Sequence, residues 1–86
     1  MAADASEPRV DALGLKCPLP VLKARRALSK LAAGATLAVQ ADDPLAAIDL
    51  PAFCQAEGHE LLAVEAASRG RIFRIRKARH SPDERI

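Results

Sequence analysis

Apolar residues follow two spacings along this chain, and the alternation between the spacings predicts the order of its elements. Runs in which every second residue is apolar are typical of strands with one buried face. Such runs occupy residues 10–13, 36–41, 61–66 and 71–77. Apolar residues recur every three or four positions, as in helices, over residues 18–31 and 44–57. The predicted order is therefore strand, helix, strand, helix, strand, strand.

The first helix has the most regular pattern. Its apolar stripe contains Val21, Ala24, Ala27, Leu28, Leu31 and Ala32. Gly34 follows and is expected to end the helix. The strand over residues 36–41 should then return parallel to the first strand, because a strand, a helix and a parallel strand form a right-handed crossover.

The second helix is less regular because Pro51 lies inside it. We expect Asp43 to cap its start, with Pro44 at the first helical position. Asp49 could cap a restart after a kink at Pro51. The residues expected to face the sheet are Leu45, Ile48, Phe53 and Ala56.

These elements predict an α+β fold, a two-layer α/β sandwich with two helices on one face of a four-stranded mixed sheet. A chain of 86 residues forms one small domain with a single core. We place that domain at residues 9–77. Residues 1–8 and 78–86 lack apolar periodicity and are expected to be a disordered leader and tail.

Charge and cysteine content narrow the class of protein. With 13 Lys and Arg against 11 Asp and Glu, the formal charge of +2 does not by itself indicate a nucleic-acid-binding protein. No apolar run is long enough to cross a membrane, and the first residues lack the features of a signal peptide, so we expect a cytoplasmic protein. The two cysteines match no metal-ligand spacing, and we expect free thiols with no metal and no cofactor.

The candidate chemistry lies at Cys17, in the stretch Lys-Cys-Pro-Leu-Pro that begins at Lys16. Proline is favoured at the first helical position, so we expect Cys17 to be the N-cap and Pro18 the first helical residue. Lys16 and the positive end of the helix should favour the thiolate and lower the pKa of the thiol. Pro18 and Pro20 should stiffen the turn and fix its direction.

Cys17 lacks the partners of a hydrolytic or dithiol enzyme. His80 lies in the expected tail, and His59 is expected to have a surface or capping role. Cys54 lies within the second helix and is interpreted as a buried packing residue. The chemistry that needs one exposed thiolate is transfer of a group carried on sulfur, such as a persulfide. A non-enzymatic regulatory or protein-interaction module stays open as the alternative.

Other charged residues have simpler interpretations. Lys23, Arg26 and Lys30 form a basic stripe on the first helix, either merely solvated or a docking surface for a protein partner. Asp42, Asp43 and Asp49 are interpreted as caps and fold determinants rather than catalysts. A last alternative is RNA binding through Arg71, Arg74 and Arg76 on the final strand. It ranks lowest, because the aromatic residues Phe53 and Phe73 both belong to the expected core.

The sequence resembles the TusA (SirA-like) family of small sulfur-carrier proteins over about residues 9–77. The resemblance is carried by the Cys-Pro-x-Pro motif at Cys17 with the following Lys23, together with the blocks at residues 31–34, 42–44, 49–54, 58–61 and 73–77. It implies the same two-layer fold and a persulfide on Cys17. Cys54 occupies a place where relatives can carry cysteine without its being the carrier.

The resemblance also implies protein partners. Family members receive sulfur from a cysteine desulfurase or a rhodanese and pass it to another protein. The destinations include tRNA thiolation, molybdenum-cofactor synthesis and, in sulfur oxidation, DsrE-type relay proteins or a heterodisulfide-reductase-like complex. Leu19 stands where tRNA-thiolation members often carry Glu, so an acidic contact near the thiol is absent. We expect a monomer that binds neither membranes nor nucleic acid.

Overall fold

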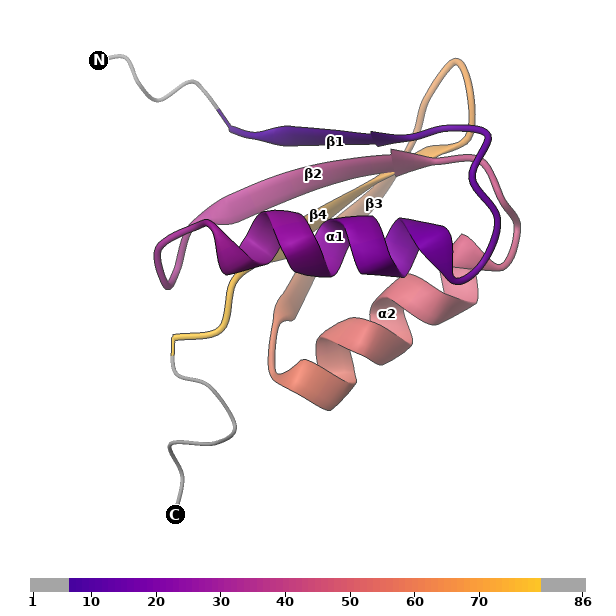
Figure 1. The fold of residues 1–86 in the computed structure, drawn as a ribbon. Helices are drawn as coiled ribbons and strands as arrows, with labels where there is room; N and C mark the ends of the chain where they lie inside the picture. The colour runs from indigo at the N-terminus through magenta and orange to yellow at the C-terminus, as the bar shows by residue number, and fades with distance from the viewer. Residues whose placement is uncertain (1–6, 80–86) are drawn as a thin grey trace.

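Two helices pack on one face of a four-stranded sheet in the computed structural model, which describes residues 7–79 (Figure 1). The elements are β1 (Arg9–Ala12), α1 (Leu19–Ser29), β2 (Thr36–Ala41), α2 (Ala46–Glu57), β3 (Glu60–Ala66) and β4 (Arg71–Arg76). The predicted α+β class and element order are confirmed. The expected leader and tail fall largely outside the described residues, and His80 lies there too.

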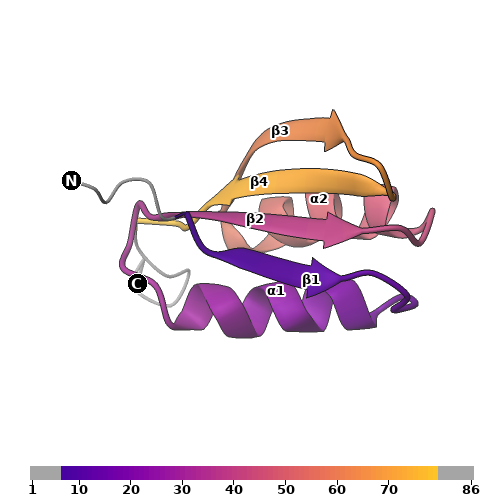
Figure 2. The same ribbon diagram turned by 90° about the horizontal axis from the view of Figure 1, so that it is seen from above.

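The sheet is mixed and has the strand order β1-β2-β4-β3, which Figure 2 shows from above. β1 and β2 are parallel, as the crossover through α1 requires. β4 pairs antiparallel with both β2 and β3. α1 lies against β1 and β2, and α2 contacts β3. The open face of the sheet carries ion pairs, including Arg76 with Glu60 at 3.0 Å.

The core forms where the alternating strand residues meet the helices. Leu37 and Val39 of β2 lie opposite Ile75 and Phe73 of β4 in the strand register, and all four side chains are buried. The helices cover them with the buried residues Ala24, Leu28, Ala46, Leu50, Phe53 and Cys54. The period-two pattern of the strands thus predicted the buried sheet face correctly.

The second helix differs from its prediction in start, continuity and buried face. It begins at Ala46 with Leu45 as N-cap, and it runs through Pro51 without a restart. Its buried residues follow one continuous helical spacing: Ala46, Leu50, Phe53 and Cys54. Of the expected inward residues, Phe53 is buried, whereas Leu45 and Ile48 are 51% and 65% exposed and Ala56 is exposed as well. The apolar burial of this face outweighs the one backbone hydrogen bond that proline cannot donate.

The chain contacts the sheet just before β1 and just after β4. The Pro8 carbonyl accepts a hydrogen bond from the Ala38 N–H at 2.9 Å, and Glu7 pairs with Arg74. The Ala78 N–H donates to Nδ1 of His59 at 2.9 Å. No described helix has the length and apolar character needed to cross a membrane.

Candidate functional site

Three loops meet at one end of the sheet (Figure 1). Parallel β1 and β2 both end there, so the segments that lead into α1 and α2 lie side by side. The hairpin between β3 and β4 returns to the same end, where Ala41 pairs with Arg71. Cys17 lies on the segment between β1 and α1, and its thiol is exposed.

Two adjacent aspartates after β2 hold this segment in place. Oδ1 of Asp42 accepts the N–H of Gly14 at 2.9 Å, and Oδ2 of Asp43 accepts the N–H of Cys17 at 2.7 Å. The Gly14 hydrogen bond and the Arg69 guanidinium at 3.0 Å hold the pKa of Asp42 below its ordinary value, although partial burial opposes them. The assigned N-cap of α2 is Leu45 rather than Asp43, but Oδ1 of Asp43 accepts the N–H of Leu45 at 3.3 Å. Asp43 thus caps the turn that leads into α2, as expected in part, and its second oxygen also fixes the backbone of the cysteine segment.

Cys17 is not the N-cap of α1. The helix begins at Leu19 with Pro18 as N-cap, and the Cys17–Pro18 peptide bond is cis. The Lys16 carbonyl accepts the N–H of Leu19 at 2.7 Å, which forms a turn just before the helix. Pro20 occupies the first helical turn, as expected, and it is buried. Cys17 lies one residue before the N-cap, and its N–H donates to Asp43, which follows β2.

The charges around the Cys17 thiol are opposite to those expected. Sγ donates a hydrogen bond to Oδ2 of Asp49, a residue of the first turn of α2. This hydrogen bond raises the pKa of the thiol, and desolvation and the negative charges of Asp49 and Asp43 raise it further. The predicted lowering of the thiol pKa is therefore wrong. Asp49 is also not the cap of a restarted helix, since α2 is continuous.

Lys16 makes no contact that offsets the negative charges around the thiol. Its side chain is exposed and makes no hydrogen bond or ion pair with any residue in 7–79. The charged side chains that act on the thiol are carboxylates.

Apolar side chains are exposed at the starts of both helices. Leu19 and Leu22 of α1 are each 46% exposed, and Leu45 and Ile48 at the start of α2 are more exposed still. We call these four residues the apolar rim. Cys17 precedes two of them in sequence, and Asp49 follows the other two. The sequence pattern missed the rim because it assigned Leu45 and Ile48 to the core.

The predicted basic stripe lines a groove between α1 and β1. Lys23, Arg26 and Lys30 form one side of it, and Arg9 and Asp11 of β1 form the other. Nζ of Lys23 donates to the Asp11 carbonyl at 2.9 Å, so this lysine covers part of the free edge of the sheet. The structure thus brings all three predicted cations to one groove.

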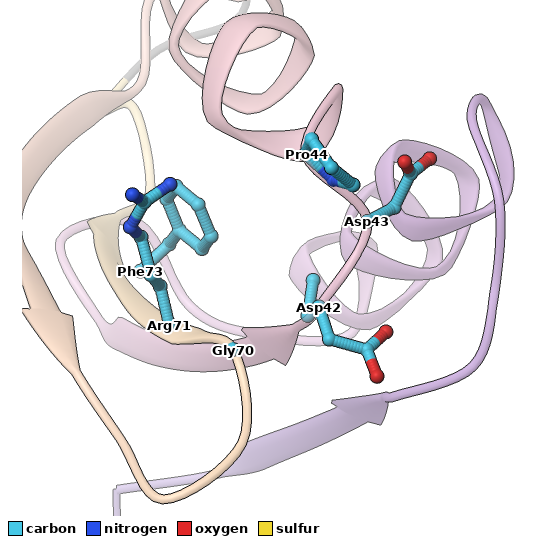
Figure 3. Close-up of a pocket in the computed structure, with 7 residues that line it drawn as sticks. Asp42, Asp43, Pro44, Gly70, Arg71 and Phe73 are labelled. Carbon is cyan, nitrogen blue, oxygen red and sulfur yellow. The ribbon is translucent and has the colours of Figure 1, made fainter.

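A small cavity lies beside the cysteine segment, between the end of β2 and the start of β4 (Figure 3). Arg71 and Phe73 extend along one side of it, whereas the carboxylates of Asp42 and Asp43 point away from Arg71. Gly70 approaches β2 so closely that a Cβ atom there would lie 2.1 Å from the Ala41 carbonyl oxygen.

The remaining candidate residues lie apart from the thiol. Cys54 is buried, as expected, and burial raises its pKa to about 11. His59 lies past the other end of α2, with its ring 5.3 Å from that of Phe53, and burial lowers its pKa. Within residues 7–79 no group of three or more His, Cys, Asp and Glu side chains is arranged to hold a metal ion.

Comparison with known proteins identifies the family of this chain. The family model for sulfurtransferase TusA matches residues 9–77. The structure is also similar to the crystal structure of a SirA-like protein from Desulfitobacterium hafniense, with 29% sequence identity and a TM-score of 0.70. That similarity covers 81% of this chain and 96% of the other. The resemblance seen in the sequence is confirmed, and the chain belongs to the TusA family of sulfurtransferases.

Proposed function

We propose that this protein is a sulfur carrier that holds a sulfane sulfur as a persulfide on Cys17. The observation that carries the proposal is an exposed thiol on a segment fixed by Asp43, in a chain of the sulfurtransferase family. In the described part of the chain, Asp49 is the one side chain that hydrogen-bonds this thiol. Further catalytic groups therefore come from partner proteins.

Loading and unloading are both exchanges at sulfur. In loading, Sγ of Cys17 attacks the outer sulfur of a persulfide on the donor, which is a cysteine desulfurase or a rhodanese. A bond forms between Sγ and that sulfur, the S–S bond of the donor breaks, the donor leaves as a thiolate, and Cys17 gives up its proton. In unloading, a thiolate of the acceptor attacks the outer sulfur and Cys17 leaves. The sulfane sulfur keeps its oxidation state throughout, so no oxidant is needed.

The surface around the thiol favours protein partners over RNA. The apolar rim offers the exposed aliphatic surface that protein interfaces bury. On the last strand, Arg74 pairs with Glu7 and Glu65, and Arg76 pairs with Glu60. These ion pairs neutralise two of the three arginines, Arg71, Arg74 and Arg76, that RNA binding would need. As the family resemblance implies, we take the acceptor to be a protein of the cytoplasm that serves tRNA thiolation, molybdenum-cofactor synthesis or sulfur oxidation, with DsrE-type relay proteins as one class.

The groove lined by Lys23, Arg26 and Lys30 is the proposed docking site for an acidic surface of one of these partners. Charge reversal by the pair Arg26→Glu and Lys30→Glu should slow sulfur transfer from a donor enzyme, mainly through slower association. The reaction of the same variant with a small disulfide is the matched control, because that reaction needs no docking. Equal slowing of both reactions, or of neither, contradicts the docking role.

The test of the carrier function is a mass measurement. The protein is incubated with a cysteine desulfurase and cysteine, and its intact mass is recorded before and after treatment with a thiol reductant. Wild type and Cys54→Ser should gain the mass of one sulfur atom and lose it on reduction, whereas Cys17→Ser should gain nothing. A sulfur atom retained on Cys17→Ser overturns the proposal. Full cellular activity of Cys17→Ala would instead support a regulatory interaction module.

A further inference from the structure

The hydrogen bond from the Cys17 thiol to Asp49 points to a second chemical group in the transfer. We propose that Asp49 is a catalytic residue that accepts the thiol proton while Sγ attacks the incoming sulfur, and returns a proton to Sγ when the sulfur leaves. This inference rests on the proposed function, since it concerns the same thiol, but it assigns a role that no pattern in the sequence indicated.

Two elements fix the geometry of this pair. The backbone of Cys17 is tied to Asp43 at 2.7 Å, and its Sγ is tied to Asp49 on α2. Asp49 lies in the first turn of the helix, next to the fully buried Leu50. Its carboxylate is thus carried by a packed helix rather than by a loop, and it does not depend on a bound partner to reach the sulfur. A proton acceptor needs hydrogen-bond contact with the proton it takes, and this contact is present.

The charged surroundings leave Asp49 as the group placed to take the proton. The titratable side chains on the neighbouring segments are Lys16 before α1, Asp42 and Asp43 after β2, and Arg69 and Arg71 at the hairpin. Arg69 is paired with Asp42, and in the described part of the chain no cation forms an ion pair with Asp49. Asp43 binds a backbone N–H and not the thiol.

The carboxylates around the thiol also restrict how its proton can leave. Carboxylates beside the thiol disfavour the free thiolate, which is the nucleophile in sulfur chemistry. A mechanism that first releases the proton to solvent works against these charges. Direct transfer of the proton to Asp49 avoids that state, because the pair keeps one negative charge throughout.

The step balances as written. The neutral Cys17 thiol, the Asp49 carboxylate and a donor persulfide give the Cys17 persulfide, neutral Asp49 and the donor thiolate. The Sγ–S bond forms as the donor S–S bond breaks, and the proton moves from Sγ to Oδ2. In unloading, the acceptor thiolate takes the outer sulfur, and the proton of neutral Asp49 passes to the departing Sγ.

The experiment measures how the rate of thiol–disulfide exchange at Cys17 depends on pH. An uncharged small disulfide, 2-hydroxyethyl disulfide, is used so that neither docking nor titration of the reagent contributes. For wild type we expect a rate nearly independent of pH between about pH 6 and 8, because the proton stays within the Cys17–Asp49 pair. In Asp49→Asn the thiolate must form by loss of a proton to solvent, so the rate should rise about tenfold per pH unit below the thiol pKa.

Two further variants separate the effect of the contact with Sγ from the effect of negative charge near the thiol. Asp43→Asn also removes a negative charge near the thiol but not the contact with Sγ. Its absolute rate should change, because Asp43 holds the Cys17 backbone, but its pH profile should stay flat. Asp49→Glu keeps a carboxylate and should restore part of the flat profile that Asp49→Asn loses. A wild-type rate that rises tenfold per pH unit, or an Asp49→Asn profile equal to that of wild type, overturns the role of Asp49.

The outcomes also separate this inference from the carrier function. If Cys17 gains no sulfur from a desulfurase but the exchange profile is flat only when Asp49 is present, the carrier proposal fails and the proton transfer stands. If Cys17 gains sulfur and the two profiles coincide, the carrier function stands and Asp49 has only a structural role.

Discussion

Replacement of Gly70 by alanine tests how closely the β3–β4 hairpin packs on β2 beside the site. Gly70 has a φ of +64° and its absent Cβ would lie 2.1 Å from the Ala41 carbonyl oxygen and 2.7 Å from the Asp42 Cα. Real Cβ contacts essentially never fall below 3.0 Å. Gly14 is the matched control, because its φ is +78° but no heavy atom lies within 4 Å of its added Cβ.

The expected loss has two parts. A left-handed backbone costs an alanine about 1–2 kcal/mol relative to glycine at either position. At Gly70 the strand must also move by about 1 Å to relieve the contact, and such overpacking costs about 1–3 kcal/mol. Alanine restricts the unfolded chain similarly at both positions, so that contribution cancels in the comparison. Gly70→Ala should therefore destabilise the protein by about 1–3 kcal/mol more than Gly14→Ala.

Urea unfolding of the two variants, followed by circular dichroism, measures this difference directly. The displaced atoms belong to Ala41 and Asp42, which precede the Asp43 that holds the Cys17 backbone. Gly70→Ala should therefore also change the rate of disulfide exchange at Cys17 in the folded protein. Equal unfolding free energies for the two variants would refute the close approach of hairpin and strand.

Three other predictions follow from single residues. Ile48→Ser should slow transfer from a donor enzyme at least several-fold while leaving exchange with a small disulfide almost unchanged, because 65% of Ile48 is exposed, its main loss is partner contact, and serine adds no charge beside the thiol; equal slowing of both reactions refutes this. Cys54, with its pKa raised to about 11, should resist alkylation at neutral pH in the folded protein and react in urea, as counted by mass spectrometry. Burial lowers the pKa of His59 below its ordinary 6.5, so the unfolded chain binds the proton first as pH falls. The contribution of neutral His59 to the free energy of unfolding should be fully present above about pH 6.5 and be lost below it. Urea unfolding measured across this range should show that His59→Gln removes this part of the decrease.

The elements with unbroken periodicity were predictable from the sequence. Alternation placed Leu37, Val39, Phe73 and Ile75 in the core, where the structure has them. The buried face of the second helix was not predictable in this way. Pro51 suggested that the helix restarts, and a restart would turn different residues toward the sheet. Burial of Leu50 and Phe53 keeps the helix continuous, and that tertiary contribution has no local signature.

The position of an exposed thiol at Cys17 was predictable, but its electrostatics were not. Local sequence shows Lys16 and a helix start beside Cys17, both of which favour a thiolate. The groups that decide the shift, Asp43 and Asp49, lie 26 and 32 residues away and reach the thiol through the fold. An aspartate near a helix start has the same sequence pattern whether it caps its own helix or binds a neighbouring segment. Which of these hydrogen bonds forms depends on which segment the fold brings beside the aspartate.

A thiol held protonated by a carboxylate suits a carrier that must react with its partners and not with other oxidants or electrophiles. A partner that covers the apolar rim removes water from the Cys17–Asp49 pair. Desolvation raises the pKa of both groups, but a carboxylate is hydrated more strongly than a thiolate. The cost of moving the proton from sulfur to oxygen therefore falls as water leaves the carboxylate. Docking would then promote the proton transfer that attack requires. Ile48→Ser, which keeps the rim hydrated without adding a charge beside the thiol, should therefore lower the rate of sulfur transfer within the bound complex as well as the affinity for the donor. Single-turnover transfer at saturating donor separates the two: an unchanged rate in the complex would restrict the rim to binding alone.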